Sequence, residues 1–187
     1  MLNKERFNTF VDAILAIIIT IMVLDIRSPT EKNFNLVSLA QSVLAYGLTF
    51  FILWVSWYSI QLLFSNVEKI SYKMYWIFAL HLFLMSLYPL LTSWIGGDLW
   101  NIKAEFAYML LGFLSFAVYH LLIEPEALKY IPPHKRPPVH VNKIINWTRI
   151  ILIVLNLTII WFFPPISLLV LVVFSLMHVR EHIKTVS

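Results

Sequence analysis

Long apolar segments separated by short polar connections run along this chain, and most of these segments have the length of a membrane-spanning helix. A helix needs about 20 predominantly apolar residues to cross the hydrocarbon core of a bilayer. Segments of this kind lie near 8–26, 37–64, 73–95, 104–123, 145–163 and 165–179. The pattern predicts an all-α fold, a single polytopic membrane domain over residues 1–187 with six transmembrane helices.

Composition supports this class. Hydrophobic residues make up 60% of the chain and charged residues 13%, and the mean hydropathy of +0.79 is incompatible with an ordinary soluble surface. The absence of cysteine excludes disulfides and thiolate metal sites. Lys4 and Arg6 precede the first apolar segment as in a signal peptide, but no small-x-small cleavage motif follows Leu24, so we expect a retained helix.

The basic residues are distributed unevenly between the two sets of connections. Of the 14 lysines and arginines, only Arg27, Lys32 and Lys103 fall on one predicted side of the membrane. The others lie on the side that holds both ends of the chain and the 65–72 and 124–144 connections. By the positive-inside rule, both termini are cytoplasmic. The net charge of +4 follows from this topology and implies no nucleic-acid partner.

The first apolar segment carries small and weakly polar residues on one side of the helix. At 100° per residue, one arc of roughly 100° holds six of its residues. They are Thr9, Ala13, Ala16, Ile17, Thr20 and Leu24. Such an arc lines a pore in some membrane proteins and packs closely against another helix in others. The pattern alone fits both interpretations.

Asp12 lies in the same segment, about 60–100° from this arc on an ideal helix. A charge at the centre of a membrane-spanning helix costs roughly 2.5–3.5 kcal/mol on insertion scales, so it should face protein or water and have a partner. We expect a structural role for Asp12, which ties this helix to its own subunit. Arg6 has the opposite charge but projects more than about 90° away, so a direct pair needs a frayed first turn or a neighbouring helix.

Catalytic and cofactor motifs are missing from the sequence. His178 and His182 are four residues apart but lack the His-Glu-x-x-His order of a zinc hydrolase. Nucleophile elbows and phosphate-binding glycine loops are not found, so we expect neither an enzyme nor a cofactor. With only four glycines and no Thr-Val-Gly-Tyr-Gly sequence, a channel built from this chain must select ions with side chains.

The start of the first segment is similar to a known motif. Arg6, Phe10 and Asp12 match the Arg-x-x-x-Phe-Ser-Asp signature of the transmembrane protein 175 family of potassium channels, and Val11 stands where the family has serine. The resemblance implies a homotetramer with four copies of the first helix around a central pore. It also implies a cell-membrane location, in the plasma membrane of a prokaryote, because single-repeat members are prokaryotic.

Roles for several residues follow from the resemblance by position. Ile17 is the expected hydrophobic constriction, Leu24 a second apolar ring, and Thr20 the polar layer beside Ile17 where potassium passes. Ala13 and Ala16 complete the pore lining. A second group of residues is expected to form the family's structural network: Arg6, Phe10, Asp12, Trp57, Gln61 and His81.

The sequence thus predicts a potassium-selective channel without a carbonyl filter. Two alternatives from other classes remain. A secondary or proton-coupled transporter would need discontinuous helices, and Pro89 is the main breaker inside a span. A non-conducting scaffold would use the small-residue arc only as a packing seam.

Overall fold

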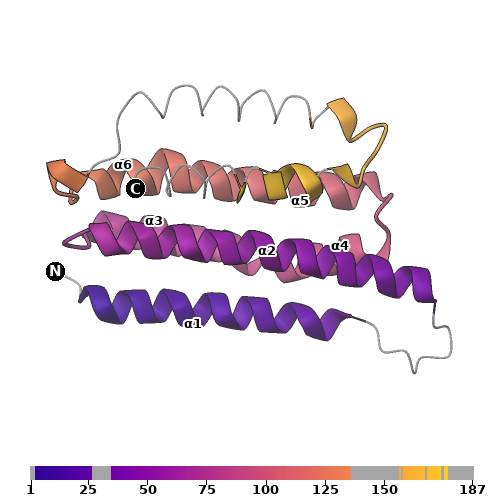
Figure 1. Ribbon diagram of the computed structural model, residues 1–187, viewed down its shortest axis with the longest axis horizontal. Coiled ribbons are helices and arrows are strands. Elements are labelled where there is room, and N and C mark those ends of the chain that lie inside the picture. Colours follow the sequence, from indigo (N-terminus) through magenta and orange to yellow (C-terminus); the bar gives the residue numbers. More distant parts are fainter. Residues whose placement is uncertain are drawn as a thin grey trace.

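A computed structural model describes residues 3–26, 35–135, 156, 158–166, 168–173 and 175–176. Over these ranges the chain forms helices and no strand, and the helices run side by side along the long axis of the molecule (Figure 1). The elements are α1 (Lys4–Met22), η1 (Val23–Asp25), α2 (Leu36–Asn66), α3 (Tyr72–Ser86), α4 (Tyr88–Gly97), α5 (Ile102–Ala117), η2 (Val118–Ile123), α6 (Glu124–Leu128) and η3 (Pro133–Lys135).

Four stretches of the described chain are long and apolar enough to cross a membrane. They are Lys4–Asp25, Leu36–Asn66, Tyr72–Gly97 and Ile102–Leu128. The coarse prediction of a helical membrane protein is therefore confirmed, and these stretches coincide with the first four predicted spans. Most of the predicted span 145–163 and the end of the predicted span 165–179 lie outside the described residues, so the total of six helices stays a prediction.

Polar residues fix where the long helices begin. Asn3 accepts hydrogen bonds from the backbone amides of the first turn of α1, and Asn35 does the same for α2. Ser71 and Asn101 cap α3 and α5 in the same way. Each cap satisfies amide groups that have no partner inside the helix, which matters near a membrane because lipid offers none.

The third span is broken near its middle. α3 ends at Ser86 and α4 begins at Tyr88, so Leu87 joins two helices that together form one span. The cause is Pro89, which has no amide hydrogen to continue the backbone ladder and whose ring crowds the preceding turn. After the break, α4 lies against α2, α5 and α1.

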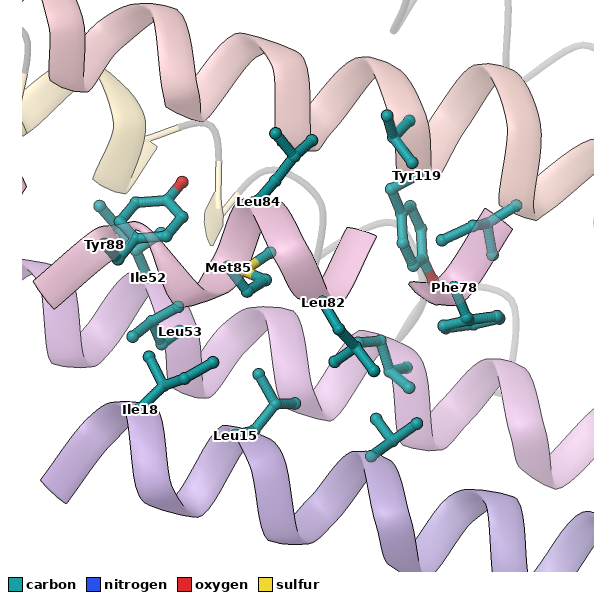
Figure 2. Packing of buried hydrophobic residues seen from close by; sticks show 14 of the residues in the cluster. Leu15, Ile18, Ile52, Leu53, Phe78, Leu82, Leu84, Met85, Tyr88 and Tyr119 are labelled. Atoms are coloured by element: carbon teal, nitrogen blue, oxygen red, sulfur yellow. The ribbon is translucent and has the colours of Figure 1, made fainter. Parts of the chain in front are cut away.

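The core forms where one face of α1 meets the helices behind it. Phe7, Val11, Leu15, Ile18 and Met22 are buried and recur every three or four residues along α1. Figure 2 shows the Leu15 and Ile18 side chains pointing from α1 into the layer that holds α2 and α3. Val11 is fully buried in this apolar stripe, which explains physically why a valine is accommodated there.

A chain of hydroxyl groups crosses the core between three helices. Thr49 of α2 and the Tyr108 hydroxyl of α5 are 2.7 Å apart, and Thr92 of α4 donates to Thr49 at 3.1 Å. Thr49 is anchored in turn to the Ala45 carbonyl at 2.8 Å. Because these side chains are buried, their hydrogen bonds hold α2, α4 and α5 in one register.

Basic residues from distant parts of the sequence gather at one end of the bundle. Lys4 donates to the Val67 carbonyl at 2.7 Å, which brings the start of α1 to the α2–α3 connection. The Glu126 carboxylate of α6 lies 2.7 Å from Lys129 and 3.6 Å from Lys73. Its hydrogen bond raises the pKa of Lys129. The N-terminus, the α2–α3 connection and α6 share one end of the molecule (Figure 1), which agrees with the positive-inside grouping.

The hydroxyl chain predicts a coupled stability effect. Tyr108→Phe removes one hydroxyl, Thr49→Val removes its partner, and the double variant removes both. Hydrogen bonds between membrane helices contribute about 0.6 kcal/mol on average and about 1.7 kcal/mol at most, so we expect a coupling energy within this range. Unfolding of the four proteins in detergent measures it, and strictly additive effects would contradict the coupling.

Candidate functional site

α1 has two faces with opposite surroundings. The six residues of the predicted arc are all exposed in the described structure. Ile17 is 56% exposed and Leu24 is 79% exposed. On an ideal helix the centre of this arc lies about 190° around from the buried stripe of α1, almost directly opposite. The face that carries the candidate pore residues is therefore the one that the described part of the subunit leaves uncovered.

Thr20 presents its oxygen in a fixed orientation on this face. Its hydroxyl lies 3.0 Å from the carbonyl oxygens of both Ala16 and Ile17, so it donates its hydrogen to the backbone of its own helix. Thr9 makes the same kind of contact, with the Glu5 carbonyl at 2.9 Å. A hydroxyl that donates inward keeps acceptor capacity on its oxygen. The arrangement can offer that oxygen to a cation.

Asp12 is held by two side chains of α2. Trp57 donates its indole N–H to Asp12 Oδ1 at 2.8 Å, and the Gln61 amide donates a hydrogen bond to the same oxygen. Trp57 and Gln61 lie one helical turn apart on α2, which allows both to reach one carboxylate. The structure thus brings three of the predicted network residues together, and through them Asp12 connects α1 to α2 of the same chain.

Asn8 joins this group, and the sequence analysis did not identify it. Asn8 Nδ2 donates to Gln61 Oε1 at 3.3 Å, and Gln61 Nε2 donates back to Asn8 Oδ1 at 3.3 Å. Asn8 precedes Asp12 by four residues, so both side chains leave the same face of α1. That spacing was the available signal, because a second polar residue one turn away on a membrane-spanning helix favours a shared partner.

The other three predicted network residues lie elsewhere. Arg6 and Phe10 are exposed on α1, and Arg6 forms no salt bridge with any described residue. His81 is buried on α3 and its ring lies 5.9 Å from that of Tyr119. It has no hydrogen bond to the Asp12 group within the described chain.

Metal ligation finds no support in the part of the chain that the structure describes. Over those residues, no group of three or more histidine or acidic side chains is placed to hold a metal ion. His178 and His182 lie outside the described residues.

Replacement of Asp12 should loosen α1. Asp12→Ala leaves the partly buried Trp57 and Gln61 donors without their acceptor, and the loss of a fully buried donor's partner costs about 1–3 kcal/mol, so we expect a cost at the lower end of this range. We expect a lower midpoint of thermal unfolding in detergent and a shift in tryptophan fluorescence. Asp25→Ala serves as the control, since Asp25 is exposed just beyond α1. Equal unfolding midpoints for the two variants would exclude the anchoring role of Asp12.

Comparisons with known proteins locate this arrangement in a family. Residues 6–89 match the model of the endosomal/lysosomal potassium channel TMEM175, a range that includes α1, α2 and α3. A protein of Chryseobacterium sp. (strain P1-3) that is named a potassium channel is 28% identical over 170 residues, which cover 89% of this chain and 88% of that protein. No solved structure matches the chain. The resemblance carried by Arg6, Phe10 and Asp12 is confirmed, because residues 6–89 match the TMEM175 potassium channel family.

Proposed function

We propose that this chain forms a passive, potassium-selective channel in a cell membrane, as a homotetramer with four copies of α1 around the pore. The match of residues 6–89 to a potassium channel family and the relative named a potassium channel support this function. The observation that carries the pore assignment is the uncovered face of α1, which combines small, hydroxyl and aliphatic side chains. In four copies, such a face turned inward would enclose a path for ions.

Selection in this channel falls to side chains. A ring of four Ile17 side chains closes the pore to water by dewetting, and a Leu24 ring does the same nearer the opposite end. Thr20 lies almost one turn from Ile17 on the same face. The Thr20 oxygen faces away from the helix and replaces part of the hydration shell of a potassium ion. The small side chains of Ala13 and Ala16 leave space for the ion. Conduction follows the electrochemical gradient and needs no cofactor.

The proposed orientation has both termini in the cytoplasm. Support comes from Lys4, Lys73 and Lys129, which share one end of the bundle with the α2–α3 connection. The positive-inside rule assigns that end to the cytoplasm. The cation path then runs from Thr9, near the cytoplasmic end of α1, past Ile17 to Leu24 at the outer end.

A polar substitution at the constriction tests the channel directly. Ile17→Asn should wet the narrowest ring and raise passive flux of potassium into liposomes. A tenfold rise corresponds to a barrier lowered by about 1.4 kcal/mol. Leu110→Asn is the matched control, because Leu110 is an aliphatic residue of similar exposure that lies on α5 and not on the proposed pore helix.

Each outcome of this experiment has a clear meaning. Increased flux for Ile17→Asn, and not for Leu110→Asn, supports a pore along the arc. In a coupled carrier, substitution of Ile17 would instead slow transport or uncouple it from the driving ion. A scaffold would show no flux from any variant while its oligomer weakens, which would refute the channel.

Thr20 should control selectivity more than conduction. Thr20→Val keeps the shape of the side chain but removes the oxygen, so we expect the ratio of potassium to sodium flux to fall severalfold. Thr20→Ser restores the hydroxyl and should restore the ratio. The measurement is the reversal potential of reconstituted protein under opposed potassium and sodium gradients. An unchanged ratio in Thr20→Val would exclude the threonine layer as a selecting element.

A further inference from the structure

A cavity of about 80 Å³ lies inside the subunit, away from the α1 face. Its walls come from α2, α3, α4, α5, η2 and the stretch that holds Leu171 and Ser175, and they include Ile52, Ser59, His81 and Ser115. On α2, the cavity residues Ile52 and Ser59 lie roughly opposite the side that Trp57 and Gln61 use, about 170° around the helix. The cavity is therefore separate from the Asp12 group and from the proposed pore.

Two buried polar side chains in the cavity wall have no hydrogen bond of normal geometry within the described part of the chain. His81 is 1% exposed and Ser115 is 3% exposed. Neither ring nitrogen of His81 nor the Ser115 hydroxyl makes a hydrogen bond of normal geometry with a described residue, although Ser115 lies close to both His81 and Tyr88. Buried polar atoms are nearly always satisfied by protein or by a bound molecule. A donor and an acceptor that both face a cavity point to an occupant that can hydrogen-bond.

The rest of the wall is mainly apolar. Ile52, Met85 and Leu171 contribute aliphatic and thioether surface, and Figure 2 shows Ile52, Met85 and Tyr88 grouped between the helices. The wall is also tightly fitted at Gly112, where a Cβ would approach the Leu171 side chain to 2.7 Å. A purely aqueous occupant would leave this apolar surface in contact with water, and a hydrocarbon would leave His81 unpaired.

The backbone beside the cavity departs from regular α-helix. η2 is a π-helical segment, and its Tyr119 lines the cavity and donates a hydrogen bond from its hydroxyl to the Ser59 carbonyl at 3.2 Å. π-helical turns inside α-helices are rare and occur frequently at functional sites. Here the π-helical turn places Tyr119 and His120 in the cavity wall next to His81 and Ser115. This irregular backbone is a second indication of a functional site, separate from the hydrogen-bond analysis.

We propose that this cavity binds a short-chain alcohol. Its hydroxyl donates to an imidazole nitrogen of His81 and accepts a hydrogen bond from Ser115, while its carbon chain packs against Ile52, Met85 and Leu171. The volume of about 80 Å³ sets the size, because an engineered cavity of about 150 Å³ holds benzene and this one is roughly half as large. Uncharged alcohols of two to four carbons also partition into membranes, through which they reach the site.

Cysteine chemistry provides the test, because the chain contains no native cysteine. Ser115→Cys changes one atom and places a thiol in the cavity wall, where methyl methanethiosulfonate should modify it. The reconstituted variant is labelled with and without 1-propanol, and mass spectrometry measures the rate of thiol modification in each case. At a propanol concentration about ten times the dissociation constant, simple competition slows labelling about tenfold.

Two further cysteine variants serve as controls. Ser65→Cys lies exposed near the end of α2, so its labelling should be fast and unaffected by propanol. Ala45→Cys is buried on α2 outside the cavity and should label slowly, also without a propanol effect. Labelling of Ser115→Cys that propanol does not slow identifies a hydrated cavity and overturns the proposal. If the folded Ser115→Cys variant is not labelled at all, the cavity is closed to small molecules, which also overturns the proposal.

A direct binding measurement is independent of cysteine chemistry and of ion flux. Trifluoroethanol should show saturable broadening of its ¹⁹F signal with the wild-type protein in detergent. Ser115→Leu fills the cavity and should abolish the saturable part, whereas Ser65→Leu should keep it. Equal broadening by the two variants would assign the signal to the micelle and refute the site. Because neither readout measures conduction, failure of the channel proposal leaves this test intact.

Discussion

A carboxylate inside a membrane-spanning helix must find its hydrogen-bond donors within the protein, because lipid supplies none. Asp12 meets this requirement through Trp57 and Gln61 of α2. The contact sets the rotation of α1 about its own axis, and the apolar stripe that begins at Phe7 is buried as a result. The face with Thr20 then points away from the rest of the subunit. One partly buried acid therefore determines which side of α1 stays uncovered by the described helices.

Hydroxyl groups determine the register of the helices, which apolar packing alone does not. Leucine and isoleucine side chains are as compatible with lipid as with each other, so packing alone specifies helix register weakly. Thr49, Thr92 and Tyr108 specify it through hydrogen bonds that connect α2, α4 and α5. Thr20 uses the same chemistry differently: it bonds to its own backbone and thereby keeps its oxygen turned outward.

The sequence predicted features that depend on one helix at a time. Helical periodicity placed Ile17, Thr20 and Leu24 on a common face, and the membrane cost of a charge predicted that Asp12 has a partner. Contacts between helices were less accessible, because a single sequence contains no direct information on how two helices are rotated against each other. Asn8 was missed although its spacing from Asp12 is visible in the sequence, because the sequence does not show that both residues face Gln61 of α2. His81 was assigned to the Asp12 network, but the structure places it at a cavity on the other side of α2.

The contacts of α1 also limit how a pore built from it can change its width. Lys4 holds the first turn of α1 to the Val67 carbonyl, Asp12 holds its middle, and Thr92 contacts Met22 near its end at 3.8 Å. A helix attached at three heights can neither slide nor rotate independently of the helices behind it. Widening of the pore would accordingly require each subunit to tilt as a rigid body, so the gating motion would extend to the lipid-facing surface and make conduction sensitive to bilayer thickness.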